Sequence, residues 1–399
     1  ERLKESVRKR LMSDVPLGAF LSGGVDSSAV VAMMREIGGG RILTCSIGFR
    51  EPEYDESRYA RLVADAFGTD HRVETVEASD YSLLERLVDV YDEPYADSSA
   101  IPTYRVCELA RRHVTVALSG DGGDENFIGY RRYRLFAAEE AVRRRLPYGI
   151  RRAVFGPLGR WYPKLDWAPR FLRGKTTFQA LARDTVDAYL HGVSICPEEL
   201  RGALFSADFR RELQGYSARE VFHRHVRGKR FEDPLALVQY LDFKTYLPGD
   251  ILTKVDRASM AHSLEVRTPF LDYELVEWVS KLPSDVKLRR GEGKYLLKEA
   301  LRPLLPEEVL FRRKMGFAVP LDVWFRGSLS DHIAGIVGSG RLADSGLFEP
   351  AVLRRLVADH KAGRRNYSAV LWALTMFEGF MRRNEVPAQG AERLLRNAS

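Results

Sequence analysis

The stretch LGAFLSGGVDSS, residues 17–28, combines an apolar run, two adjacent glycines, three serines and one carboxylate. The apolar residues 17–21 predict a buried strand, and the apolar residues after Asp26 recur with helical spacing. The glycines between them let backbone amides approach a ligand, and free amides at a helix start favour an anion. Hydroxyl donors come from Ser22, Ser27 and Ser28. A carboxylate at Asp26 fits beside phosphates if it holds Mg²⁺, which prefers oxygen ligands and bridges phosphates.

The stretch SGDGGDE, residues 119–125, repeats this arrangement after the apolar run 114–118. Asp121 and Asp124 lie three residues apart, so their carboxylates are expected to face the same place. Aspartates and glycines are also common in solvent-exposed turns, and the second stretch by itself favours such a turn. Together with the first stretch, it favours a shared site for phosphates and a metal ion.

The first 130 residues alternate between strand and helix patterns, which predicts a parallel sheet with helices on both faces. The predicted strands are residues 17–21, 41–47, 71–76 and 114–118. Ligands of such sheets bind beyond the carboxyl ends of the strands. Residues 22–28, the end of the strand at 44–48 and residues 119–124 should therefore meet at one edge.

The rest of the chain divides into two predicted parts, a helical insertion at 131–233 and a largely helical part at 234–399 that completes the site. Lys314 precedes a glycine and an aromatic residue, so it either closes over a polyphosphate or is an ordinary surface lysine. The carboxylate of Glu265 and the guanidinium of Arg267 lie among apolar residues and are predicted to pair.

Two histidines, His223 and His225, stand two residues apart in the predicted insertion. A zinc site needs more ligands, and none follow at a suitable spacing. We therefore expect these histidines to lie at the surface or to serve packing.

Composition narrows the class of protein. The chain of 399 residues carries a net charge of +7, with arginines grouped at 131–134, 143–145 and 151–173. These groups indicate either a solvated helical surface or a nucleic-acid face, and no motif for nucleic-acid binding supports the second interpretation. No apolar run approaches the roughly 18 residues of a membrane span. Three separated cysteines without a CxxC pair fit a reducing cytoplasm, which is the expected location.

The strings LSGGVDSS, SGDGGDE, HSLEVRTPFLD and RRKMGF resemble, in order and spacing, the C-terminal synthetase domain of glutamine-dependent asparagine synthetases. The first string is similar to the SGGxDS pyrophosphate loop of enzymes that split ATP between the α and β phosphates. The family includes β-lactam synthetases. The resemblance covers residues 1–399 and implies an α/β fold of the adenine-nucleotide α-hydrolase type.

The resemblance also implies roles for individual residues. ATP and its pyrophosphate would be held by Leu21, Ser22, Gly23, Gly24, Asp26, Ser27, Ser28, Ile47, Ser119 and Gly120. Mg²⁺ would be held by Asp26 and Asp124. Asp121 and Lys314 would be catalytic, Asp121 toward the adenylate and the incoming amine and Lys314 toward charge on the phosphates.

The implied reaction adenylates a carboxylate, by default the β-carboxylate of aspartate, releases pyrophosphate and transfers ammonia to form an amide and AMP. The family's glutaminase half, with its N-terminal cysteine nucleophile, is absent from this sequence. We therefore expect a fragment, or an enzyme that uses free or partner-supplied ammonia. The resemblance further implies a homodimer, whereas no membrane or nucleic-acid partner is expected.

Two further departures from the family pattern bear on the site. Relatives usually read DELFGGY where this chain has DENFIGY, residues 124–130, and Ile128 would strain a backbone that needs positive φ. Some relatives carry an arginine that holds aspartate in the segment matching residues 96–102, which has no basic residue here.

Three alternatives therefore stay open. The first is the same chemistry on another carboxylate, for example in a cell-envelope or secondary-metabolite pathway. The second is an enzyme that modifies tRNA bases, and the third is a binding module without catalysis.

Overall fold

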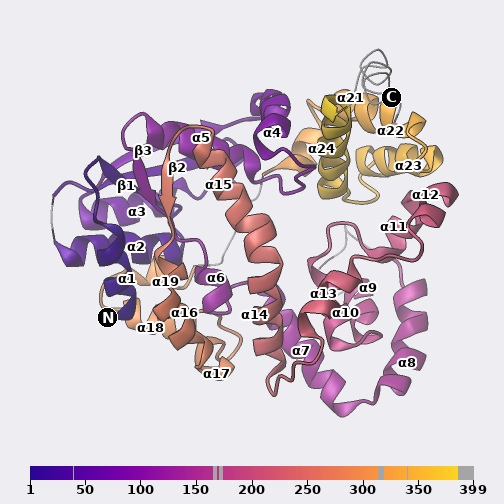
Figure 1. Ribbon diagram of the computed structural model, residues 1–399, viewed down its shortest axis with the longest axis horizontal. Coiled ribbons are helices and arrows are strands. Elements are labelled where there is room, and N and C mark those ends of the chain that lie inside the picture. Colours follow the sequence, from indigo (N-terminus) through magenta and orange to yellow (C-terminus); the bar gives the residue numbers. More distant parts are fainter. Residues whose placement is uncertain (39, 165–168, 170–173, 313–318, 339, 385–399) are drawn as a thin grey trace, which may run out of the picture.

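A five-stranded parallel sheet with strand order β3-β2-β1-β4-β5 lies at the centre of one half of the molecule (Figure 1). The computed structural model describes residues 1–384 apart from 39, 165–168, 170–173, 313–318 and 339. The strands are β1 (Leu17–Phe20), β2 (Leu43–Phe49), β3 (Asp70–Val76), β4 (Val116–Leu118) and β5 (Glu265–Arg267). The predicted class, a parallel α/β sheet with flanking helices, is confirmed.

Helices cover both faces of this sheet, because its central strands are buried on both sides. Apolar side chains of α2 and α3 pack against one face, and those of α4, α5 and α15 pack against the other. The helices of this first part are α1 (Arg2–Arg10), α2 (Val25–Ile37), α3 (Ser57–Phe67), η1 (Ala78–Leu83), α4 (Leu84–Tyr91), α5 (Ala100–Arg111) and α6 (Gly123–Asn126).

The strand β5 comes from a segment that the sequence shows only as extended. It pairs with β4 through Val116 opposite Glu265 and Leu118 opposite Arg267. The predicted pair within β5 is present, since Nε of Arg267 lies 2.6 Å from Oε1 of Glu265.

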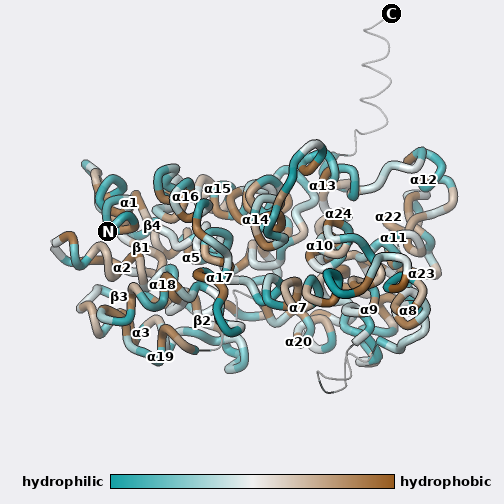
Figure 2. Tube along the Cα trace, turned by 90° about the horizontal axis from the view of Figure 1, so that it is seen from below, coloured by the Kyte–Doolittle hydropathy of each residue, from teal (hydrophilic) through white to brown (hydrophobic). Residues whose placement is uncertain are grey.

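A second group of helices lies at the end of the molecule opposite the amino terminus (Figures 1 and 2). They follow one another within residues 131–233, where an insertion of helices is predicted. They are α7 (Arg131–Arg145), α8 (Tyr148–Trp161), α9 (Lys175–Leu181), α10 (Thr185–Val193), α11 (Glu198–Leu204), α12 (Ala207–Glu212) and α13 (Arg219–Val226).

A long helical rod, α14 (Pro234–Lys244), η3 (Leu247–Leu252) and α15 (Thr253–Met260), connects these helices to the sheet (Figure 1). Its middle part η3 is a π-helix, a rare geometry that is frequent at functional sites. The remaining helices are η4 (Pro269–Leu271), α16 (Tyr273–Ser280), α17 (Ser284–Lys287), α18 (Tyr295–Leu301), α19 (Glu307–Leu310), α20 (Leu321–Arg326), α21 (Ser330–Gly338), α22 (Arg341–Asp344), α23 (Pro350–Lys361) and α24 (Ser368–Asn384).

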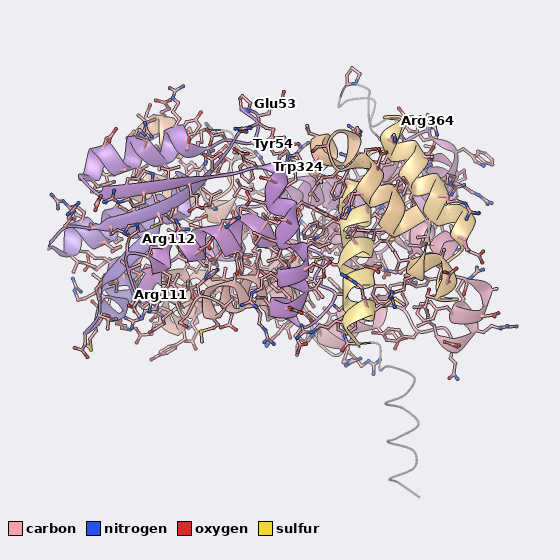
Figure 3. All side chains as sticks on the ribbon, turned by 90° about the horizontal axis from the view of Figure 1, so that it is seen from above. Glu53, Tyr54, Arg111, Arg112, Trp324 and Arg364 are labelled. Carbon is pink, nitrogen blue, oxygen red and sulfur yellow. The ribbon has the colours of Figure 1, made fainter. Side chains whose placement is uncertain are left out.

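The loop after β2 joins the sheet to α20. The hydroxyl of Tyr54 donates to Oδ1 of Asp322 at 2.8 Å, and the indole N–H of Trp324 donates to Oε1 of Glu51 at 2.8 Å. Figure 3 shows Tyr54 and Trp324 side by side at this junction. Because Trp324 is almost fully buried, these bonds fix α20 against the sheet. Within the part of the chain that the structure describes, no helix is both long and apolar enough to cross a membrane.

We predict that His360 makes the stability of this junction depend on pH. The ring is 1 % exposed, packs against Phe325, and accepts the backbone N–H of Tyr367 at Nδ1. Burial lowers the pKa of His360 to about 4, so the neutral ring is the form that stabilises the fold. That contribution is complete above the ordinary pKa near 6.5 and is lost as the pH falls toward about 4.

His360→Gln should therefore flatten the fall in melting temperature between pH 7 and pH 4.5. His113→Gln is the matched control, since that ring is exposed to water in the folded chain. An unchanged pH slope in His360→Gln would contradict this role.

Candidate active site

The loop after β1 is folded by its own serines and glycines. The hydroxyl of Ser27 accepts the N–H of Ser22 at 3.2 Å and donates to the carbonyl of Gly24 at 3.2 Å. Gly23 has a φ of 71°, and a Cβ there would lie 2.4 Å from the backbone nitrogen of Ala60 in α3. Only glycine therefore fits at this point, and α2 begins at Val25 without a side-chain cap on its first amides.

The loop after β4 lies directly against the first loop because β1 and β4 are neighbours in the sheet. A Cβ on Gly120 would lie 2.7 Å from the nitrogen of Ser27, and one on Gly123 would lie 2.5 Å from Oδ1 of Asp26. The sheet extends from β1 toward β2 on one side and toward β4 on the other. Crevices that bind ligands form at such switch points.

Lys294 lies between the carboxylates of the two loops. Its Nζ is 2.7 Å from Oδ1 of Asp124 and also forms an ion pair with Asp26. Burial alone would lower the pKa of Lys294, but the two carboxylates outweigh it and raise this pKa above its ordinary value. One cation therefore occupies the point where the two loops converge.

These residues fit a divalent cation as well as an ammonium group. Asp26 and Asp124 supply carboxylate oxygens from two rigid loops to one position, which is the donor type that Mg²⁺ prefers. The glycines at 120 and 123 leave the side of Asp26 open to this close approach.

A cavity of about 1270 Å³ lies over both loops. The predicted residues that line it are Leu21, Ser22, Gly24, Asp26, Ser27, Ile47, Ser119, Gly120, Asp121 and Asp124. Gly23 contacts α3 behind the loop, and Ser28 is fully buried in α2. Lys314 lies outside the described residues. The structure thus brings the predicted residues of both loops to one cavity.

Two carboxyl groups on the floor of the cavity have raised pKa values. Burial raises the pKa of Asp121, which accepts a hydrogen bond from the hydroxyl of Ser119. Burial and the neighbouring Asp124 raise the pKa of Glu125 to about 7, and the hydroxyl of Tyr130 donates to it at 2.6 Å. The pKa of Glu125 thus lies near neutral pH, which suits a group to proton transfer.

A family profile described as asparagine synthase matches residues 1–382 of this chain. The chain belongs to the asparagine synthase family. It is 32% identical over 378 residues to "Asparagine synthetase [glutamine-hydrolyzing] 1" of Bacillus subtilis, covering 94% of this chain and 57% of that protein.

Two further relatives show the range of names in the family. The chain is 36% identical over 390 residues to a "Putative asparagine synthetase [glutamine-hydrolyzing]" of Mycobacterium tuberculosis, covering 94% of this chain and 56% of that protein. It is 28% identical over 395 residues to "Amidase chry2" of Gibberella zeae, covering 88% of this chain and 56% of that protein. The chain thus spans little more than half the length of these relatives.

The sequence does not predict where the basic residues of other elements meet the cavity, although Lys254 stands out as a charge among apolar residues that must pair or serve a ligand. Lys294 and Lys254 come from distant helical segments, and Arg312 donates from Nε to the carbonyl of Gly23 at 3.1 Å and pairs with Glu56 at 2.6 Å. Their positions depend on the fold, so no local pattern marks them. The string GKYLLKEA at 293–300, which contains Lys294, shows by itself only the pattern that begins a helix.

Lys254 supplies a cation to the segment 96–102, in which the sequence shows none. Its Nζ lies 2.8 Å from Oδ2 of Asp97 and 2.7 Å from Oγ of Ser99. Burial opposes ionisation of Asp97, but Lys254 and Ser99 together lower its pKa to about 2. The charge of Lys254 is thus largely matched by Asp97.

Ile128 adopts a positive φ, the conformation in which an isoleucine is expected to be strained. Its φ is 55° and its side chain is fully buried beside Tyr133 and Val238. Its neighbours hold the site together: the N–H of Gly129 donates to the carbonyl of Asp124, and the N–H of Lys294 donates to the carbonyl of Phe127. The expected strain is therefore present, and apolar burial offsets it.

Asn126 is the other residue of this loop that departs from the usual family pattern, and its contacts explain its presence. The amide of Asn126 donates to the carbonyls of Gly122 and Phe270 at 2.9 and 2.8 Å. It therefore links the loop after β4 to η4.

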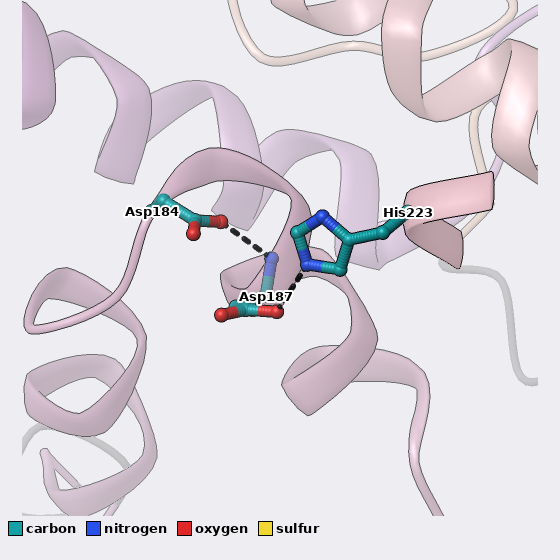
Figure 4. Close-up of side chains that lie close together, drawn as sticks. All are labelled: Asp184, Asp187 and His223. Atoms are coloured by element: carbon teal, nitrogen blue, oxygen red, sulfur yellow. Dashed lines mark hydrogen bonds and ion pairs between the residues drawn. The ribbon is translucent and has the colours of Figure 1, made fainter. Parts of the chain in front are cut away.

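His223, which the sequence predicts to lie at the surface or to serve packing, lies outside the cavity. It is near two carboxylates, those of Asp184 and Asp187 (Figure 4). Nε2 of His223 lies 2.9 Å from Oδ1 of Asp187, and Arg219 binds the same carboxylate with both Nε and Nη2. Asp184 accepts the N–H of Asp187 as the cap of α10. The protein's own donors occupy these oxygens, so the group joins α10 to α13.

We predict that Lys294→Met exposes a Mg²⁺ dependence of folding. Removing the cation leaves the carboxylates of Asp26 and Asp124 close together, which should destabilise the fold by about 3 kcal/mol in metal-free buffer. Millimolar MgCl₂ should restore part of this loss, as measured by urea unfolding with EDTA or MgCl₂.

The matched control is Lys298→Met in α18, the helix that follows Lys294. This variant loses an ion pair with Glu292, a residue whose side chain is 40% exposed. Mg²⁺ should not stabilise that variant more than the unaltered chain. An equal response of both variants to Mg²⁺ would show that Asp26 and Asp124 do not form a cation site.

We predict that the usual order of stability, alanine above glycine, does not hold at position 128. At an ordinary position, glycine is roughly 0.5–1 kcal/mol less stable than alanine. At a φ of 55°, alanine keeps a strain of about 1–2 kcal/mol that glycine lacks. Ile128→Gly should therefore be at least as stable as Ile128→Ala in urea unfolding, although both lose about 2–5 kcal/mol of packing. A less stable glycine variant would refute strain at this residue.

Proposed function

We propose that this chain is the synthetase part of an ATP-dependent amide synthetase. It would adenylate a carboxylate, release pyrophosphate, and transfer ammonia to give an amide and AMP. The observation that carries the proposal is the convergence of Asp26 and Asp124, from the loops after β1 and β4, on one cation at the edge of a large cavity. Membership of the asparagine synthase family supports it.

The proposed chemistry has two steps. In the first, an oxygen of the substrate carboxylate bonds to the α-phosphorus of ATP, and the bond to the β-phosphate oxygen breaks as pyrophosphate leaves. In the second, ammonia bonds to the acyl carbon, and the bond from that carbon to the AMP oxygen breaks. A proton must leave the attacking nitrogen, and the carboxylate of Asp121 is the proposed acceptor.

Each loop has a proposed role. The free amides at the start of α2 and the hydroxyls of Ser22 and Ser27 would bind the pyrophosphate part of ATP. Leu21 and Ile47 would flank the adenosine, with Ser119 and Gly120 in contact with it. Mg²⁺ held by Asp26 and Asp124 would neutralise phosphate charge. The catalytic role of Lys314 stays a prediction.

Aspartate is the default carboxylate substrate. The surroundings of Lys254 are also compatible with a different carboxylate substrate. Among the described residues, Lys254 is the only cation that contacts the segment 96–102, and Asp97 already balances its charge. The relative named "Amidase chry2" carries a name other than asparagine synthetase, which supports keeping this possibility. We therefore keep a different carboxylate as the second candidate.

A tRNA-thiolating enzyme has less support. Cys45 lines the cavity, but burial raises the pKa of its thiol to about 12, so little thiolate would be present at neutral pH. Ammonia from a glutaminase domain, a homodimer and a cytoplasmic location stay predictions.

The first test is pyrophosphate release from MgATP with ammonium chloride, with aspartate and without an acceptor. Asp26→Asn should lower release by about 100-fold or more, because it weakens the charge stabilisation at the phosphates. Thermal melting checks that this variant folds. The control is Asp65→Asn, an exposed carboxylate on α3 that should leave release unchanged.

Aspartate-dependent release with accumulation of asparagine would establish the default substrate. Release only with another carboxylate would keep the chemistry and replace the substrate. ATP binding without release for any carboxylate, or full release by Asp26→Asn, would contradict the proposal.

A further inference from the structure

The helix α8 presents an apolar face to solvent. Ile150, Val154 and Leu158 recur every four residues, and Trp161 follows three residues later, so these side chains share one face. They are 52%, 49%, 41% and 79% exposed, respectively. Exposed single apolar residues are common, but an aligned set on one helix marks an interaction site.

The opposite face of α8 already serves the fold. Arg151 donates to the carbonyls of Leu146 and Arg183, and the ring of Phe155 stacks on Phe178 of α9. Gly159 lies against Gln179, where a Cβ would be 2.9 Å from the Gln179 side chain. The exposed apolar face is therefore not needed to hold α8 in place.

The surroundings of this face are strongly cationic. No aspartate or glutamate occurs from Ala141 to Leu165. Four arginines of this stretch are exposed: Arg144, Arg145, Arg152 and Arg160. Arg160 lies beside the apolar face, and Arg144 and Arg145 precede α8 by a few residues, whereas Arg152 lies on the side of Phe155 and Gly159. An aliphatic stripe with a tryptophan in such a cationic stretch is typical of helices that lie in the interface of an anionic membrane.

The position of α8 leaves this face accessible. The helix lies at the end of the molecule opposite the amino terminus and the sheet in both views (Figures 1 and 2). Its axis runs along the edge of the second group of helices rather than through it. A flat surface could therefore reach α8 without covering the sheet.

We propose that the face formed by Ile150, Val154, Leu158 and Trp161 docks on the surface of an anionic lipid bilayer, with the exposed arginines at 144, 145 and 160 binding lipid phosphates. A nucleic acid would use the arginines, but its bases stack on aromatic rings and have no use for the aliphatic side chains. A neutral protein groove would use the aliphatic side chains but would leave the arginines unmatched. An anionic bilayer matches both features.

The test is sedimentation of the 399-residue chain with vesicles of 70% phosphatidylcholine and 30% phosphatidylglycerol, against vesicles of phosphatidylcholine alone. Binding should require the anionic lipid and weaken with salt. Val154→Glu should lower the partition coefficient about tenfold, because it removes the burial of one valine side chain. Arg145→Glu with Arg160→Glu should lower it at least as much.

The matched control is Val323→Glu, since Val323 is 51% exposed on α20 and lies outside this face. It should bind vesicles like the unaltered chain. Trp161→Phe should remove the blue shift of tryptophan fluorescence that binding produces, which reports insertion rather than aggregation.

Four outcomes would overturn the proposal. The first is no sedimentation with anionic vesicles, and the second is equal binding of vesicles by Val154→Glu and the unaltered chain. The third is tRNA binding that the arginine variants abolish, with no binding of vesicles. The fourth is a dimer in sedimentation velocity that Val154→Glu dissociates, again with no binding of vesicles. Because α8 contributes no residue to the cavity lining, pyrophosphate release should be the same in all these variants without vesicles.

Discussion

The close approach of the loops after β1 and β4 is the constraint on which the candidate site depends. Two neighbouring parallel strands end at the same edge, and glycines at 120 and 123 let the second loop touch Ser27 and Asp26. Any side chain there would push the loops apart, and the carboxylates of Asp26 and Asp124 could no longer share one cation. Backbone contact between the two loops thus sets the geometry of the site, and this contact determines where the charged side chains lie.

The backbone of the same region is strained at two residues that are not glycine. Ile128 and Lys294 both have positive φ, and their segments touch, since a Cβ on Gly293 would lie 2.3 Å from the carbonyl oxygen of Ile128. Such conformations persist only where surrounding contacts over-determine them, and they gather at functional sites. Here the burial of Ile128 and the ion pairs of Lys294 supply those contacts.

The cavity contains carboxyl groups in two different environments. Asp26, Asp124 and Asp97 each bind a lysine. Asp121 and Glu125 are buried and form no ion pair with another described residue, and burial raises their pKa values. Groups of one chemical type whose environments separate their protonation states can take different roles in one reaction. Carboxyl groups that bind a lysine and carboxyl groups with raised pKa values therefore lie in one cavity.

The sequence by itself determined the alternation of strands and helices, the two glycine loops and the residues that line the cavity from them. Those features depend on local burial and on backbone freedom, which leave a periodic or compositional pattern in the chain. The pairing of β5 with β4, and the arrival of Lys294 at Asp26 and of Lys254 at Asp97, were decided only by the tertiary structure. A lysine more than 150 residues from its partner leaves no local pattern, because its role follows from where the packed core places its helix.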